Sequence, residues 1–150
     1  ATMRDYRKIE AWQLADDLAV AIYRLSNVLP REEIYGLTSQ MRRSAVSVAA
    51  NIVEGSARET KGDYLHFLHI ARGSLAETRH FIHLTRRLEY VPESDANAVE
   101  ELSRRAYACL HGLIKAVEKD AGKPDRLAAT VKALAVLGSA HLSLIPAHDL

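Results

Sequence analysis

The sequence predicts an all-α protein: an up-down-up-down four-helix bundle with an additional C-terminal tail that has the spacing of one short extra helix. A chain of 150 residues has the length of one domain. Its four prolines and seven glycines divide it into long blocks. Within these blocks apolar residues recur at intervals of three and four, the period of an amphipathic helix. This spacing is typical of long helices rather than of many short strands.

The first helix is expected over residues 9–29, IEAWQLADDLAVAIYRLSNVL. Its apolar seam repeats with steps of four and three and consists of Ala11, Ala15, Leu18, Ile22, Leu25 and Leu29. Pro30 should end the helix, because proline disfavours helical geometry in the residue before it.

The second helix is expected over residues 37–54, with a seam of Leu37, Met41, Ala45, Val48 and Ile52. Small side chains flank this seam, namely Ser44, Ser47, Ala49 and Ala50. Small residues allow another helix to approach closely, so we expect tight packing against this helix.

The third helix is expected over residues 62–89, where one broad apolar side carries Tyr64, Phe67, Leu68, Ala71, Leu75, Thr78, Phe81, Ile82 and Leu88. The fourth is expected over residues 93–119, with a seam of Val99, Leu102, Ala106, Cys109 or Leu110, Leu113 and Val117. Pro92 stands at the start of this helix, the place where helices tolerate proline best.

Four amphipathic helices with short connections bury their stripes by packing together as a bundle. We therefore expect a bundle over residues 1–119 and a separate tail over residues 120–150. Within the tail, PDRLAATVKALAVLG has helical spacing through Leu127, Val131 and Leu134. We expect the tail to be peripheral or to contact a neighbouring subunit.

Charge and cysteine content narrow the class of protein. The chain has 20 basic and 19 acidic residues, so its net charge of +1 excludes a polycation but not a local basic face. The single cysteine, Cys109, forms no intramolecular disulfide and suits a reducing cytoplasm. No apolar stretch follows the polar segment 3–8, so we expect no signal peptide. No apolar run approaches the roughly 20 residues that span a membrane.

The histidines are the first candidates for metal chemistry. His66 and His69 lie three residues apart, as do His80 and His83, and such pairs could bind a metal. The two pairs are about 16 Å apart along one helix and cannot share an ion. The alternative is a solvated polar face, and we expect no metal and no cofactor. Cys109 is expected to be buried and inert, and no nucleophile motif or phosphate loop occurs, so we expect no enzyme.

A basic stripe on the third helix is the most informative polar pattern. It consists of His69, Arg72, Arg79, His83 and Arg86, is widened by Arg87, and extends over about 25 Å. We expect it to lie roughly opposite the apolar face, where phosphates could bind along it. The alternative is an ordinary solvated helix surface. Leu65 and Leu84 fall on this polar side and, if exposed, would indicate subunit contact.

The stretch NIVEGSAR, residues 51–58, predicts a structural motif. Gly55 should end or loosen the second helix, because it supplies backbone freedom that a side chain would restrict. Glu54 follows Asn51 by three residues and precedes Arg58 by four, and pairs at these spacings meet on a helix. We expect Asn51 and Glu54 to fasten the second helix to the turn and to the start of the third.

Three stretches together carry a family resemblance: EAWQLADDLAVAIY, EIYGLTSQMRRSAVSVAANIVEGSAR and DYLHFLHIARGSLAE. From about Asp5 to Lys119 the chain resembles a bacterial four-helix-bundle family. Its members include proteins encoded in 23S rRNA intervening sequences and the accessory variability protein of diversity-generating retroelements. The residues in the family's order are Trp12, Tyr35-Gly36-Leu37, Gln40, Arg42-Arg43, Asn51, Glu54-Gly55, Arg58, Phe67-Leu68, Ala71, Gly73-Ser74 and Glu77.

This resemblance implies a ring-like homopentamer, association with RNA or DNA and, for the retroelement branch, binding to a reverse transcriptase. Two functions therefore remain open. One is a nucleic-acid-associated accessory protein without enzymatic activity, and the other is an oligomeric scaffold or protein-interaction module with no nucleic-acid role. The basic stripe distinguishes them, because a scaffold does not require it.

Overall fold

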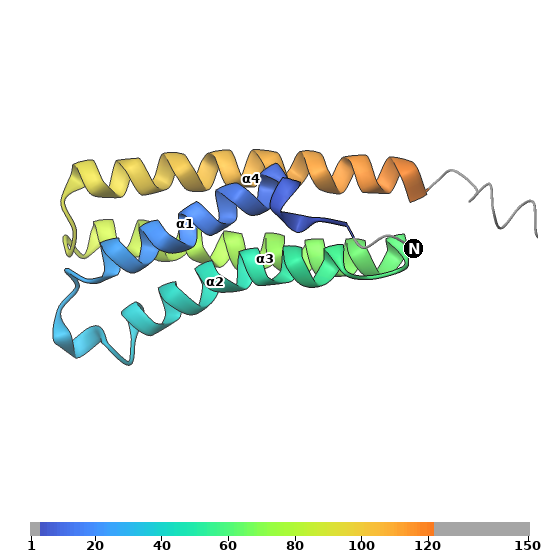
Figure 1. Ribbon diagram of the computed structural model, residues 1–150. Coiled ribbons are helices and arrows are strands. Elements are labelled where there is room, and N and C mark those ends of the chain that lie inside the picture. Colours follow the sequence, from blue (N-terminus) through green and yellow to red (C-terminus); the bar gives the residue numbers. More distant parts are fainter. Residues whose placement is uncertain (1–3, 122–150) are drawn as a thin grey trace, which may run out of the picture. The chain divides into compact units, whose positions relative to one another are not determined.

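The computed structural model describes residues 4–121, and over this range the regular structure is entirely helical. The α-helices are α1 (Glu10–Ser26), α2 (Leu37–Ser56), α3 (Lys61–Arg87) and α4 (Glu93–Ala121). Short 3-10 helices, η1 (Tyr6–Lys8) and η2 (Arg31–Glu33), precede α1 and α2. Consecutive α-helices run in opposite directions (Figure 1). The predicted four-helix bundle is confirmed, whereas the tail segment with Leu127, Val131 and Leu134 lies outside the described residues.

The helix ends differ from the predicted ones by a few residues, and local bonding explains the difference. α1 ends at Ser26, before Pro30, and the Leu29 amide bonds back to the Ser26 carbonyl at 3.3 Å in a tightened last turn. α2 continues through Gly55 to Ser56, so the glycine does not end it. α4 begins at Glu93, directly after Pro92, as predicted.

Leu102, Leu113 and Val117 of the predicted α4 seam are only partly buried, and the unpredicted Ile114 is fully buried in their place. The other predicted seam residues contribute to one hydrophobic core. Among its largest fully buried side chains are Leu18, Ile22, Met41, Ile52, Leu68, Leu75, Ile82, Leu110 and Ile114. On α4 the core position belongs to Leu110, while Cys109 is half-buried beside it. Leu88 lies just after α3 and is 44% exposed, so its predicted burial is wrong.

Two connections are stabilised by side-chain caps. The Glu33 carboxylate accepts the Leu37 amide at the start of α2 at 3.0 Å and the Tyr90 hydroxyl at 3.2 Å, which links the α1–α2 and α3–α4 connections. The Thr60 hydroxyl accepts the Asp63 amide at 3.1 Å and so caps α3. The Glu33 contacts lie at one end of the bundle and the Thr60 cap at the other, and the basic stripe of α3 lies between them.

Candidate nucleic-acid interface

The predicted basic stripe flanks the apolar face of α3 instead of lying opposite it. Arg72, Arg79 and Arg86 each follow a buried residue by one position, and one residue along a helix turns the side chain by about 100°. The contacts of Arg79 and Arg86 with α4 show that the stripe faces the interface between α3 and α4. His69, His83 and Arg87 are exposed, while the other three cations are half-buried. Leu65 and Leu84 are partly buried against the core, so the expected exposed leucines are absent.

Arg86 is bound by three side chains of α4. Its Nη1 is 2.6 Å from a Glu100 carboxylate oxygen, and its Nη2 donates to the Asn97 side-chain oxygen at 2.7 Å. Its buried Nε lies 3.3 Å from a Glu93 carboxylate oxygen without hydrogen-bond geometry, so Glu93 contributes charge rather than a hydrogen bond. Because these groups neutralise Arg86, its primary role is to join α3 to α4.

Arg79 lies seven residues before Arg86 on α3, farther from the α3–α4 connection, and has a different partner. Its guanidinium carbon is 5.5 Å from the centroid of the Tyr107 ring on α4. The two side chains line a groove of about 490 Å³ together with Ala76, Ile82, His83, Glu100 and Ser103. Among the residues that the structure describes, Arg72 and Arg87 form no ion pair. The cations open to a ligand are thus Arg72, Arg79 and Arg87, with His69 and His83 beside them.

Tyr107 and Glu100 were not among the predicted site residues, although the sequence carries a signal for both. On α4 the residues Glu93, Asn97, Glu100, Arg104, Tyr107 and His111 follow one another by steps of four and three. Residues with this spacing share one flank of a helix. The antiparallel pairing of α3 with α4 brings this flank to the stripe, as the contacts of Arg86 and Arg79 show.

Asn51 bonds within α2, to a serine that contacts the middle of α3 rather than its start. Its amide nitrogen donates to the Ser47 carbonyl at 2.8 Å and to the Ser47 hydroxyl at 3.0 Å. The Ser47 hydroxyl is in turn 2.9 Å from that of Ser74 on α3. A neighbouring hydroxyl pair, Thr78 and Ser44, is buried at the same interface, with 2.9 Å between the oxygens. Asn51 therefore acts on the α2–α3 interface only through Ser47, whose hydroxyl it orients.

We expect Asn51→Ala to lower the free energy of unfolding by about 1 kcal/mol, because it removes the half-buried donor to Ser47. The matched control is Gln40→Ala, an exposed amide on the same helix. Chemical denaturation followed by circular dichroism measures both. Equal stability of the two variants would show that the Asn51 hydrogen bonds contribute nothing.

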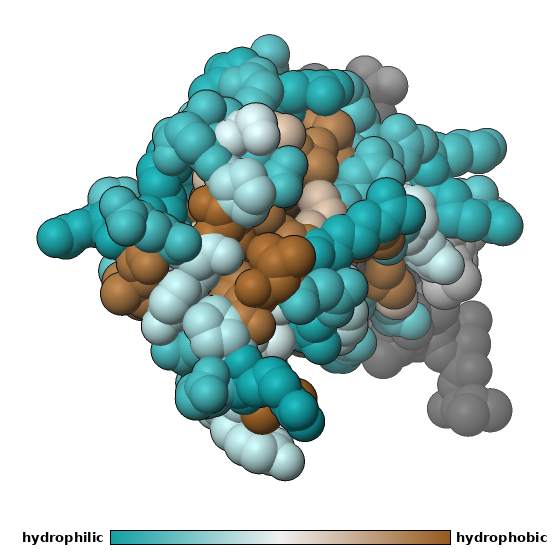
Figure 2. All heavy atoms as spheres, turned by 90° about the vertical axis from the view of Figure 1, so that its left-hand side faces the viewer, coloured by the Kyte–Doolittle hydropathy of each residue, from teal (hydrophilic) through white to brown (hydrophobic). Residues whose placement is uncertain are grey.

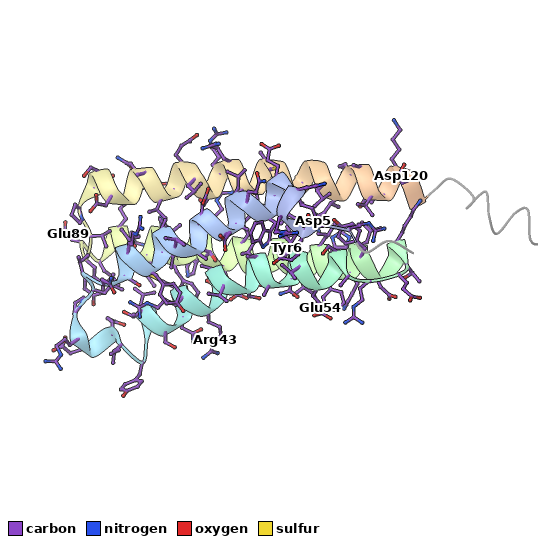
Figure 3. All side chains as sticks on the ribbon, in the orientation of Figure 1. Asp5, Tyr6, Arg43, Glu54, Glu89 and Asp120 are labelled. Atoms are coloured by element: carbon purple, nitrogen blue, oxygen red, sulfur yellow. The ribbon has the colours of Figure 1, made fainter. Side chains whose placement is uncertain are left out.

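Glu54 and Arg58 pair at the end of the bundle where α2 turns into α3. Figure 3 places Glu54 on the outer side of α2 near this end, and its carboxylate forms an ion pair with Arg58. The Arg58 guanidinium also lies 4.7 Å from the centroid of the Phe67 ring on α3. Arg4 donates to the Arg58 main-chain oxygen at 3.2 Å and lies over Tyr64. These contacts tie the N-terminal segment and α2 to the start of α3.

Gly55 has a structural role with a cause other than the predicted one. No glycine in the described residues has positive φ, and α2 continues through Gly55, so backbone freedom does not explain this glycine. A Cβ at Gly55 would instead come within 2.9 Å of the Tyr64 ring and 3.0 Å of Phe67 Cβ. Glycine is therefore required here for the close approach of α2 to α3.

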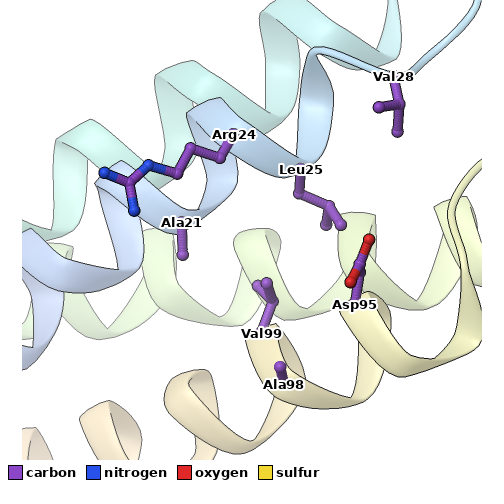
Figure 4. Close-up of a pocket in the computed structure, with 7 residues that line it drawn as sticks. All are labelled: Ala21, Arg24, Leu25, Val28, Asp95, Ala98 and Val99. Carbon is purple, nitrogen blue, oxygen red and sulfur yellow. The ribbon is translucent and has the colours of Figure 1, made fainter.

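The remaining candidates are less suited to chemistry. Residues 4–121 contain no group of three or more His, Cys, Asp and Glu side chains that could hold a metal ion. Burial raises the pKa of the Cys109 thiol, and the nearby Glu10 carboxylate acts in the same direction. A second cleft, of about 280 Å³, lies between two segments of the chain. One is the end of α1 together with Val28, and the other is the start of α4. Figure 4 shows its apolar floor, with Arg24 extending away from Asp95, so the two charges do not converge.

No helix within the described range is long and apolar enough to cross a bilayer.

Comparison with known proteins places this geometry in a family context. The family model for 23S rRNA-intervening sequence proteins matches residues 7–112. The chain is also similar to a crystal structure from Bacteroides thetaiotaomicron, a protein of unknown function from the S23 ribosomal protein family. The two are 26% identical with a TM-score of 0.65, and the similarity covers 70% of this chain and 98% of the other. None of the curated proteins matches the chain.

Proposed function

The chain belongs to the 23S rRNA-intervening sequence protein family, and we propose that it is a non-enzymatic, oligomeric accessory protein that binds RNA or DNA. The cytoplasm is the compartment we propose, since a lone thiol suits it. The observation that carries the nucleic-acid role is the groove between α3 and α4, where Arg79 and His83 line a wall beside Tyr107. Phosphates attract such cations mainly through the release of condensed counterions.

Self-assembly is the second part of the proposal. The net charge of +1 and the neutralised Arg86 leave one subunit few free cations, so a monomer should bind weakly. A homopentamer, which the family resemblance implies, would present the groove five times. A strand that reaches several copies then gains affinity through multivalency. For a retroelement-type member, a reverse transcriptase is the candidate protein partner.

Fluorescence anisotropy with labelled RNA and DNA tests this proposal at about 50 and 200 mM salt, the range in which phosphate contacts weaken strongly. We expect binding at the lower salt that falls at the higher. Arg72→Glu combined with Arg79→Glu should abolish it, because both free cations on the groove side of α3 change sign. Arg43→Glu, an exposed reversal on α2, is the matched control and should leave binding unchanged.

Light scattering on the same samples gives the oligomer mass, and a particle of 16.6 kDa would contradict self-assembly. Absence of binding at low salt, or undiminished binding by the double variant, would remove the groove from the proposed function.

A scaffold or protein-interaction module is the second candidate, and one observation favours it. Four large apolar side chains stay exposed near the end formed by the α1–α2 and α3–α4 connections: Val28 at 59%, Ile34 at 56%, Tyr35 at 94% and Leu88 at 44%. Figure 2 views this end and shows apolar side chains interrupting the hydrophilic surface. Such exposure is typical of a protein-contact surface. Loss of nucleic-acid binding in the test above would leave this candidate.

A further inference from the structure

We infer that the α3–α4 groove accommodates an unpaired nucleobase, so that the protein prefers single-stranded nucleic acid to duplex. This inference rests on the proposed nucleic-acid binding and specifies which form is bound. It is carried by the residues that α4 adds to the groove: an aromatic ring, a carboxylate and a buried hydroxyl.

The flank of α4 changes character along the groove. Near the α3–α4 turn it carries Glu93, Asn97 and Glu100, which bind Arg86. Farther from the turn it carries Tyr107 and then His111, which is exposed. Acidic groups therefore occupy one end of the α3–α4 interface, while the aromatic ring and the cations of α3 occupy its middle. A strand bound along this interface would keep its phosphates away from the carboxylates of α4 and beside the cations of α3 that form no ion pair.

The middle of the groove provides a stacking surface. The Arg79 guanidinium carbon lies 5.5 Å from the centroid of the Tyr107 ring, and both side chains line the groove. Nucleobases stack on both tyrosine rings and arginine planes. Ala76 and Ile82 add apolar surface, and a groove of about 490 Å³ falls within the usual range of small-molecule sites.

The charges inside the groove favour a base over a phosphate. Glu100 lines the groove, and its carboxylate remains beside Arg86 at 2.6 Å, where it would repel a phosphate placed deeply. The Ser103 hydroxyl donates to the Glu100 main-chain oxygen at 2.7 Å, so its lone pairs remain able to accept from a base. Arg72 lies seven residues before Arg79 on the same flank of α3, and His83 is exposed at the groove, so both are suited to the backbone phosphates. This arrangement places the base inward and the phosphates outward.

A duplex cannot use this arrangement without losing base pairing. Its bases are stacked within the helix, and extruding one costs a few kcal/mol. An unpaired strand bears little of this cost, while stacking contributes about 1–3 kcal/mol per base. We therefore expect a single strand to bind about 10-fold or more tightly than a duplex of the same sequence.

The experiment compares three labelled probes by anisotropy at about 50 mM salt: a single-stranded oligonucleotide, its blunt duplex, and an abasic strand of the same length. The single strand should bind best, and the abasic strand should bind no better than the duplex. Tyr107→Leu should reduce single-strand affinity to the duplex level, whereas Tyr107→Phe should retain the preference. The matched control is Tyr23→Leu. The Arg42 guanidinium carbon lies 4.8 Å from the centroid of the Tyr23 ring, but Tyr23 is on α1, outside the groove.

Equal, salt-sensitive binding of all three probes would overturn the inference and leave the proposed function standing. The same holds if Tyr107→Leu keeps the single-strand preference. Absence of binding to every probe would refute the proposed function, and the inference would fall with it.

Discussion

Gly55→Val is expected to lower the free energy of unfolding by about 2–3 kcal/mol, through overpacking between α2 and α3. Its Cβ would lie 2.9 Å from the Tyr64 ring, 3.0 Å from Phe67 Cβ and 3.2 Å from the Tyr64 carbonyl oxygen. Two of these three atoms belong to the backbone of α3 or are attached directly to it, so no side-chain rotation relieves the contact. The two γ-methyl groups of valine add further volume at the same interface.

Thermal denaturation measures this effect, which corresponds to a fall in Tm of about 5–10 °C for a domain of this size. The matched control is Gly73→Ala, since a Cβ at Gly73 meets nothing within 4 Å. Gly73 lies inside α3, where alanine should stabilise the helix by about 0.5–1 kcal/mol. If the valine variant at Gly55 melts with the wild type, the close approach of α2 to α3 is not essential to stability.

Gly55 also shows that a sequence can identify an important glycine without showing why glycine is needed there. A glycine near the end of an apolar stripe is compatible with a helix terminus or with close helix packing. The first depends on local geometry, but the second depends on where α3 docks. The sequence therefore indicated a structural role for Gly55 but not its cause, because the close contact with Tyr64 and Phe67 arises only when α3 packs against α2.

Helix periodicity accounts for most of the fold that could be predicted. Apolar steps of three and four identified four helices, and Pro92 marked the start of α4 correctly. The spacing of apolar residues is less informative about the side of the helix that the basic stripe faces. Because each stripe residue follows a core residue by one position, the stripe is turned by about 100° from the core and reaches the neighbouring helix. Its position opposite the apolar face was thus predicted wrongly, although its members were identified.

The candidate interface depends on pairing between α3 and α4, which a helix pattern alone does not specify. Arg79 meets Tyr107, a residue 28 positions later, and Arg86 meets Glu100. Both contacts follow from the antiparallel register that the short α3–α4 connection imposes. A single helix shows cations at regular spacing, whereas the partner helix decides which of them are neutralised.

Arg86 and Arg87 should therefore differ in what the same substitution affects. At Arg86 it should mainly lower stability, and at Arg87 it should mainly weaken nucleic-acid binding. Arg86→Gln is expected to lower the free energy of unfolding by about 1 kcal/mol, because it removes the ion pairs that the half-buried Arg86 makes with the exposed Glu93 and Glu100. The Arg86 side chain is 27% exposed. Arg87→Gln, at the adjacent exposed position, should change stability by less than about 0.5 kcal/mol.

Nucleic-acid binding should show the reverse order. Arg87→Gln removes a cation free of ion pairs among the described residues, so we expect weaker binding and a shallower salt dependence, by about one phosphate contact for each subunit that touches the strand. Arg86→Gln, assayed well below its Tm, should retain the wild-type salt dependence, because the carboxylates of α4 already neutralise this arginine. Urea denaturation and anisotropy on the same two preparations give both quantities. If Arg86→Gln weakens binding as much as Arg87→Gln while the protein stays fully stable, the contact between Arg86 and α4 opens when the ligand binds, and the fixed structural role assigned to Arg86 is wrong.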